Sequence, residues 1–356
     1  MLETPVTIDF EEMLRTLRRE GTPSRVHHME LFLDPEVQDA IDDRYGVSAD
    51  LDRNDPQYGL KRYVALQRFL GYDHVSCTVE GIIIAFKLNV AEDTAEETRE
   101  GGRNWMEEKS AVITNWEEFE KFDWPDVNNI RTEMLEFFEA NLPDDMCVVG
   151  HCGHFCETLT WIMGYETLCY ALYDQRDLVE AIRDKIWEIE KATIEALLQF
   201  ERVRAIWGSD DMGFKTGLMI SAADIREFVL EGHKKLARMA HDAGRLYLLH
   251  ACGNLSDIMD DLIDDVKIDA KHSFEDTIEP VTDSKRAYGD RLSLIGGIDV
   301  NFLCLADEPA IRKRVRETLE TCQPGGGYLL GTGNSVANYI PVDNYLTMLD
   351  EGRKFS

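Results

Sequence analysis

The sequence predicts an α/β fold, specifically a single (β/α)8 barrel, because short apolar segments alternate with amphipathic helical segments along most of its 356 residues. Apolar strands separated by helices are typical of a parallel sheet that is covered on both faces. About eight such units indicate a closed barrel, which often has this length. The alternative is an open doubly wound sheet. It usually carries a glycine-rich phosphate loop after an early strand, and the sequence shows none there.

Eight segments have the composition of buried strands. They are 25–33, 74–81, 146–153, 203–210, 246–253, 268–274, 292–299 and 328–333. Three helices separate the later ones. Apolar residues at helical spacing predict a helix over 173–200, and a capping pattern at Ser221 and Asp224 begins another over 221–243. A third is expected over 307–321, and the glycines at 325–327 then form a turn.

Two segments lie outside this alternation. Residues 1–24 are expected to form a helical extension of the single barrel domain. Residues 85–128 carry glutamate-rich runs together with Trp105, Trp116 and Trp124. We interpret this second segment as an inserted hairpin and loop that help to roof the site, and the alternative is an acidic surface loop anchored by its tryptophans.

The charge balance excludes two classes of partner. The chain has 68 acidic and 38 basic side chains, a formal net charge of -30. Such a surface repels nucleic acid and anionic membranes. No apolar run is long enough to span a bilayer, and the N-terminus has no secretory pattern. The eight cysteines are scattered, which is typical of a reduced protein, so we expect a cytoplasmic location.

One predicted strand ends in two side chains that zinc prefers. Segment 246–253 ends in His250-Ala251-Cys252-Gly253. Residues i and i+2 of a strand project to the same side, so His250 and Cys252 are expected to point the same way. Imidazole and thiolate are common zinc ligands, and we predict that both hold a metal. The alternatives are a buried small hydrophobic residue for Cys252 and a hydrogen-bonded core histidine for His250.

The other strand ends are polar as well. Active sites of barrels lie at the C-terminal ends of the strands. These ends carry His154, Glu157, Asp210, Asp211, Asn254, His272, Glu275, Asp299 and Asn334. So many polar ends predict one shared pocket. Simpler roles stay open, because Glu157, Asp210 and Asp211 could cap helices. His272 and Asp299 could instead bond to backbone amides.

Motifs at these ends resemble the uroporphyrinogen decarboxylase superfamily. They read Ser-Asp-Asp at 209–211, His-Ala-Cys-Gly-Asn at 250–254, Gly-Gly-Ile-Asp at 296–299, Gly-Thr-Gly-Asn-Ser at 331–335 and Ile-Pro-Val-Asp-Asn at 340–344. The chain is more similar to the cobalamin-dependent methyltransferase branch, which includes methylcobalamin:coenzyme M methyltransferases and the methyltransferases of bacterial O-demethylase systems. The resemblance extends from about residue 25 to the C-terminus and also implies a (β/α)8 barrel.

The resemblance implies a zinc site, with one departure. In the coenzyme M enzymes a second cysteine, after the last strand, completes the site. Aligning the tail at 340–344 places Asn334 at that position. The third ligand is therefore missing or replaced, and the candidates are Glu157, Cys156, His154, His272 and Glu275. Zinc with His, Cys and a neutral Asn would have a net charge of about +1 and be a stronger Lewis acid, whereas a carboxylate would restore neutrality.

The resemblance implies a zinc-dependent methyltransferase that moves a methyl group between a small donor or acceptor (a methyl ether, a methylamine or a thiol) and cobalamin. The sequence has no Asp-x-His-x-x-Gly motif, so a separate corrinoid protein would carry the cobalamin. In this hypothesis His250 and Cys252 hold zinc. The expected catalytic residues are Glu157, Asp210, Asp211, His272 and Asp299, and the expected substrate contacts are His154, Asn254, Asn334 and Glu275.

Two other functions remain open. A uroporphyrinogen decarboxylase would carry, by the same resemblance, an arginine-rich N-terminal motif suited to a substrate with many carboxylates. The predicted first strand holds only Arg25, and Glu30 would repel such a substrate. The third hypothesis is a protein of the same fold that binds a corrinoid protein without catalysis.

Overall fold

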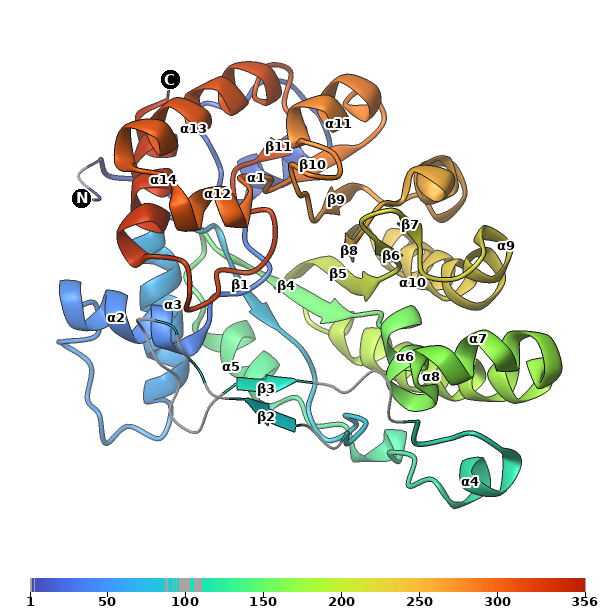
Figure 1. Cartoon of the computed structure of the whole chain (residues 1–356). Helices are drawn as coiled ribbons and strands as arrows, with labels where there is room; N and C mark the ends of the chain where they lie inside the picture. Colours follow the sequence, from blue (N-terminus) through green and yellow to red (C-terminus); the bar gives the residue numbers. More distant parts are fainter. Residues whose placement is uncertain are drawn as a thin grey trace.

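The protein has an α/β fold built around a curled sheet of seven parallel strands, seen in a computed structural model (Figure 1). The structure describes residues 2, 4–86, 89–91, 93, 95, 103–105 and 111–355. In sheet order, the strands are β1 (His74–Cys77), β4 (Cys147–Cys152), β5 (Val203–Asp211), β8 (Leu246–Cys252), β9 (Ala270–His272), β10 (Ser293–Ile295) and β11 (Tyr328–Leu329). Each overlaps one of the predicted segments from 74–81 onward.

The predicted first strand is not a regular strand. Within 25–33, His28 forms single parallel bridges with Tyr72 and with Leu330, which lie beside the two edge strands of the sheet. The pairing with Leu330 is interrupted where the backbone N–H of Thr332 donates to the carboxylate of Glu30, at 2.9 and 3.0 Å, and it returns only as a single bridge between Leu33 and Val336. The prediction of a regular strand over 25–33 was therefore wrong. The complete eight-stranded barrel stays a prediction.

Helices surround the sheet, and most of them cover its outer face (Figure 1). They are α1 (Phe10–Leu17), α2 (Pro35–Tyr45), α3 (Tyr58–Leu70), α4 (Trp116–Lys121), α5 (Glu133–Asn141), α6 (Cys156–Met163), α7 (Tyr165–Asp174), α8 (Arg176–Leu197), α9 (Ala222–Asp224), α10 (Glu231–Asp242), α11 (Val281–Tyr288), α12 (Val300–Leu305), α13 (Glu308–Cys322) and α14 (Val342–Lys354). Short 3-10 turns form at Val127–Asn129 (η1) and Ser256–Ile258 (η3), and π-helical segments form at Ile225–Leu230 (η2) and Asp261–Val266 (η4). None of the described helices is long and apolar enough to cross a membrane.

The predicted helices form with small differences at their ends. The segment 173–200 divides at Gln175, so that α7 ends and α8 begins there. The segment 221–243 combines α9, η2 and α10 and begins at the expected cap, because the Ser221 hydroxyl accepts the N–H of Asp224 at 3.1 Å. Both helices bury their apolar face against the sheet, which explains why helical spacing in the sequence could predict them.

Two apolar clusters fill the two faces of the sheet. Alternation along each strand sends Val149, Trp207 and Leu248 into an inner cluster, while their neighbours pack outward against the helices. Helix α1 also belongs to the inner cluster, and it lies across the N-terminal strand ends: the Leu17 carbonyl accepts the hydroxyl of Ser293 at 2.6 Å. This end of the sheet is therefore filled with side chains, which leaves the C-terminal strand ends for a site.

The inserted segment 85–128 lies partly outside the described residues. Its described part contains a hairpin, in which β2 (Asn89–Ala91) pairs antiparallel with β3 (Arg103–Trp105). Trp116 begins α4 and is 43% exposed, and the ring of Trp124 packs against that of Phe122 at 4.6 Å. A second small hairpin, β6 (Gly213–Phe214) with β7 (Gly217–Leu218), follows β5. Whether the insertion roofs the site stays a prediction.

Candidate metal centre

Three donor side chains come together at the C-terminal ends of β5 and β8. His250 and Cys252 project to the same side of β8, with the Cys252 Sγ at 3.3 Å from the His250 Nε2. Asp211 of β5 stands opposite Cys252 in the register of the two strands. One ligand atom from each of the three residues lies within 4.8 Å of the other two. Among the described residues, this is the group that could hold a metal ion.

The third donor is Asp211 rather than a residue expected for that role. None of Glu157, Cys156, His154, His272 and Glu275 belongs to the group of donors found among the described residues. The Asn334 amide instead donates to the Cys252 Sγ at 3.4 Å. Asp211 is the third donor because the parallel pairing of β5 and β8 places it beside Cys252. Zinc with a neutral imidazole, a thiolate and a carboxylate is electrically neutral, so the positive site expected with Asn334 does not arise.

Hydrogen bonds behind the cluster fix the tautomer of His250. The Thr332 carbonyl can only accept, so the His272 Nε2, at 3.3 Å from it, carries a hydrogen. Burial lowers the pKa of His272 to about 3, so its ring is neutral and its Nδ1 has a free lone pair. The His250 Nδ1 lies 2.7 Å from that atom and must donate to it. The His250 Nε2 therefore presents its lone pair to Cys252 and Asp211.

The electrostatics of the cluster suit a cation. Burial raises the pKa of Cys252 to about 12, and burial together with Asp210 raises the pKa of Asp211. Burial and the neighbouring His272 hold the pKa of His250 well below its usual range. Two acidic groups are thus placed where their anions are unfavourable without a positive partner. A dication bound by these three atoms removes that penalty, and the donor set fits zinc.

Asp210 is bonded away from this cluster. Its carboxylate accepts the backbone N–H groups of Phe155, Cys156 and Glu157, at 3.1, 2.9 and 2.8 Å, and so caps the first turn of α6. The His233 Nε2 lies 3.0 Å from the same carboxylate. Because successive strand residues point to opposite faces, Asp210 serves the helix layer while its neighbour Asp211 joins the three candidate metal ligands.

Asp299 is also bonded to backbone amides. Its carboxylate accepts the N–H of Phe302 at 2.8 Å as the cap of α12, and the N–H of Asp276 at 2.9 Å. It still borders a cavity of about 520 Å³ together with Glu275 and Asn334, beside the cluster. These two hydrogen bonds hold the Asp299 side chain in place in the wall of this cavity.

His154 and Glu157 form an ion pair at the start of α6. The His154 Nδ1 lies 2.9 Å from the Glu157 carboxylate. Burial opposes the charge on His154, but the carboxylates of Glu157 and Glu190 outweigh it and raise the pKa of His154 to about 9. Burial also raises the pKa of Glu157. His154 lines an apolar cavity of about 300 Å³ and is thus a cation facing that cavity at neutral pH.

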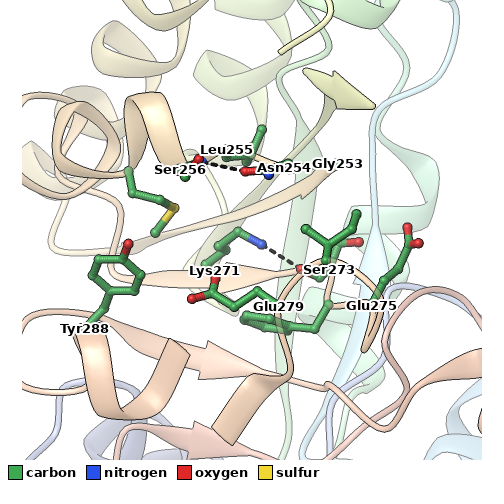
Figure 2. A pocket seen from close by; sticks show the side chains of 12 residues that line it. Gly253, Asn254, Leu255, Ser256, Lys271, Ser273, Glu275, Glu279 and Tyr288 are labelled. Carbon is green, nitrogen blue, oxygen red and sulfur yellow. Dashed lines mark hydrogen bonds between the residues drawn. The ribbon is translucent and has the colours of Figure 1, made fainter. Parts of the chain in front are cut away.

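A further cavity lies behind the cluster (Figure 2). It has a volume of about 200 Å³ and is bordered by Asn254, whose side chain accepts the N–H of Ser256 at 3.1 Å. Lys271 also lines it, a residue for which the sequence predicts no role. A lysine inside an apolar strand was the signal that could have found it, since such residues are rarely buried.

A family model and a solved structure are similar to this chain over most of its length. A family model described as uroporphyrinogen decarboxylase (URO-D) matches residues 107–355. A comparison with curated proteins finds no match. A solved structure described as a methyltransferase from Methanosarcina mazei has a TM-score of 0.67 and 19% sequence identity, covering 98% of each chain. Another, from Listeria monocytogenes and described as a vitamin-B12 independent methionine synthase, has a TM-score of 0.46 and 12% identity, covering 94% of this chain and 97% of its own.

Proposed function

The chain belongs to the uroporphyrinogen decarboxylase family, and we propose that within it the protein is a zinc-dependent methyltransferase that works with a corrinoid protein. The observation that carries the proposal is the group of Asp211, His250 and Cys252, with its three donor atoms within 4.8 Å of one another. The fold shared with the Methanosarcina mazei methyltransferase supports the same class of reaction.

The three donors would hold zinc in a neutral site. Zinc bound there supplies Lewis acidity, which either lowers the pKa of an acceptor thiol or polarises the heteroatom of a methyl donor. With Asp211 as the third ligand the site is neutral, so its charge does not favour polarising a methyl donor over binding a thiol. The direction of transfer therefore has to come from experiment, with methyl ethers, methylamines and thiols as the small molecules to compare.

Protein groups around the cluster have separate tasks in this proposal. His154 holds a proton beside the apolar cavity of about 300 Å³ and can give it to the heteroatom that loses the methyl group, while Glu157 orients its ring. Asn254, Asn334 and Glu275 lie on cavity walls beside the cluster and would contact the substrate. Asp210 and Asp299 position α6 and α12, and His272 orients the ligand His250.

The corrinoid would arrive on a partner protein at the C-terminal strand ends. The cavity of about 520 Å³ opens there beside Asn334, which touches the thiol of Cys252. The eight cysteines are all free thiols, which supports a location in the cytoplasm as part of this proposal. No nucleic acid or membrane is needed for this activity.

Metal analysis of the purified protein tests the proposal. We expect about one zinc per chain by mass spectrometry. We also expect its loss in Cys252→Ala and Asp211→Asn, while Cys169→Ala on α7 keeps it as a matched cysteine control. Methyl transfer to or from a free corrinoid should be lost in the same variants. Equal zinc and equal turnover in Cys252→Ala and the unchanged protein would refute the assignment.

Porphyrinogen decarboxylation is the second candidate, favoured by the description of the matching family model. Arg25 does not serve it at the cluster, because its guanidinium pairs with Asp73 near the N-terminal strand ends. Of the described residues that line the three cavities around the cluster, none is an arginine. Incubation with uroporphyrinogen III should therefore give no coproporphyrinogen, and formation of that product would place decarboxylation first.

A further inference from the structure

The cavity behind the metal centre is built around a buried lysine. It lies outside β9, between the loop after β8 and the loop that leads to α11, and measures about 200 Å³ (Figure 2). Its polar lining comes from Asn254, Ser256, Lys271, Ser273, Glu275, Glu279 and Tyr288. Ser273 separates it from the cluster, with the Ser273 Oγ at 3.5 Å from the Cys252 Sγ. The cavity therefore lies one side chain away from the candidate metal.

Lys271 is buried on the outer face of the sheet. It pairs in register with Leu249 and Leu294, which both pack in the outer apolar cluster, and it is only 7% exposed. Its ammonium donates to the Ser273 carbonyl at 2.6 Å and lies 4.3 Å from the centre of the Phe274 ring. An ammonium has three hydrogens to donate. In the part of the chain that the structure describes, Lys271 has no ion pair and only this one acceptor.

The opposite end of the cavity is negative. Figure 2 shows the Lys271 ammonium turned toward Ser273, with the Glu279 carboxylate and the Tyr288 hydroxyl on the other side. Glu279 is close enough to Lys271 and to Tyr288 to act on the pKa of both. Within the described residues, the Glu279 side chain has no hydrogen bond or ion pair. One small space thus holds a cation with spare donors and, on its other side, an anion with spare acceptors.

We propose that this cavity binds a small zwitterion of the amino-acid or betaine type. Its carboxylate accepts the two remaining ammonium hydrogens of Lys271, and its cationic nitrogen lies at Glu279 and the Tyr288 ring. A phosphate does not fit this pattern, because its second charge would add to the negative charge of Glu279 in the same cavity. A neutral ligand would leave the buried ammonium of Lys271 and the Glu279 carboxylate without partners. The inference concerns binding and does not depend on the proposed methyl transfer.

Calorimetric titration with four probes tests the complementarity. We expect glycine and glycine betaine to bind, and acetate and tetramethylammonium, which each carry only one of the two charges, to bind at least about tenfold more weakly, or about 1.4 kcal/mol. No binding of either zwitterion to the unchanged protein would overturn the proposal. Acetate binding as tightly as glycine would overturn the zwitterionic assignment.

Variants then separate the two ends of the cavity. Lys271→Met keeps the length of an unbranched side chain and removes the charge, so it should fold and lose zwitterion binding at least tenfold. Glu279→Gln should weaken glycine betaine but leave acetate unchanged, while Glu320→Gln, on an exposed position of α13 that does not line the cavity, should change neither. Melting temperature and zinc content should stay near those of the unchanged protein in all three. Full affinity in a folded Lys271→Met protein would refute the site, whatever the outcome of the metal analysis.

Discussion

The hydrogen bond between the rings of His250 and His272 predicts the effect of a substitution at position 272 on zinc affinity. His272→Leu removes the acceptor for the His250 Nδ1–H, so the lone pair of Nε2 is no longer fixed toward the metal. Groups that orient a metal ligand in this way typically contribute about 10- to 100-fold to metal affinity. We expect a loss of that size for zinc in a competition titration with a chelator.

A conservative variant at the same position is the control. Asn at position 272 can place its Oδ1 near the former Nδ1, so His272→Asn should retain more zinc affinity than His272→Leu. Equal losses in the two variants would show that the ring acts only through packing. A spectroscopic readout on labelled histidine would report the tautomer of His250 directly.

The pairing of His154 with Glu157 predicts a pH dependence. The pKa of His154 is raised from 6.5 to about 9, so its charge contributes fully to stability below pH 6.5 and this contribution is lost as the pH rises through about 9. Turnover that needs the proton of His154 should likewise stay constant below this point and fall above it. His154→Gln should lower the rate and remove the alkaline fall. A rate profile that keeps the same alkaline limb in the variant would assign that limb to another group.

Some residues of the candidate site can be predicted from the sequence, and others cannot. His250 and Cys252 were predictable because the spacing of two residues in one strand is a local property. Asp211 as the third donor was not, since it depends on the register between β5 and β8. The sequence showed Asp210 and Asp211 as equivalent neighbours, and only burial and hydrogen bonds distinguish the helix cap from the metal ligand.

At the scale of the elements, Asp210 joins β5 to α6. Asp210→Asn replaces a carboxylate that accepts three N–H groups with an amide whose nitrogen cannot accept. We expect a loss of about 3 kcal/mol in the free energy of unfolding, measured by urea denaturation. Asp307→Asn is the matched control, because Asp307 caps α13 through one N–H at 3.0 Å and Asn caps nearly as well. A loss of similar size in both variants would contradict the special role of Asp210.

Local patterns predicted most elements because each has an apolar face of its own. The seven strands of the sheet and the long helices α8 and α13 all fall within or beside the predicted ranges. The segment at 25–33 was apolar enough to predict a strand, yet the Glu30 carboxylate takes the N–H that would extend its ladder. Glu30 and Thr332 are 302 positions apart in the sequence. A bond between them cannot be inferred from a window of neighbouring residues.

For the whole molecule, metal binding should be visible as stability. A ligand that binds only the folded state adds about 4 kcal/mol at a concentration 1,000 times its Kd. We therefore expect zinc to raise the melting temperature of the metal-depleted protein by several degrees in a thermal scan. Asp211→Asn should show no such shift, and a shift of equal size in that variant would place the bound zinc elsewhere.

The net charge of -30 was the one property of the entire chain that composition alone could supply. It describes partners better than it describes the fold, since charge affects association and solubility. The net charge does not describe the cavities, because the buried Lys271 makes one of them locally positive in a chain that is negative as a whole. Cavities arise where loops from several strand ends meet, and no composition or local spacing contains that information.

Helix α1 closes one end of the interior of the sheet with its apolar side chains. In the proposed reaction, the small molecule and the corrinoid-carrying partner would therefore both approach from the opposite end, where the cluster lies. The small molecule then has to enter before the larger partner docks, and product has to wait until that partner leaves. Initial-rate kinetics would show a compulsory order of addition. The partner protein would inhibit at high concentration, because its docking would block entry of the small substrate and release of the product.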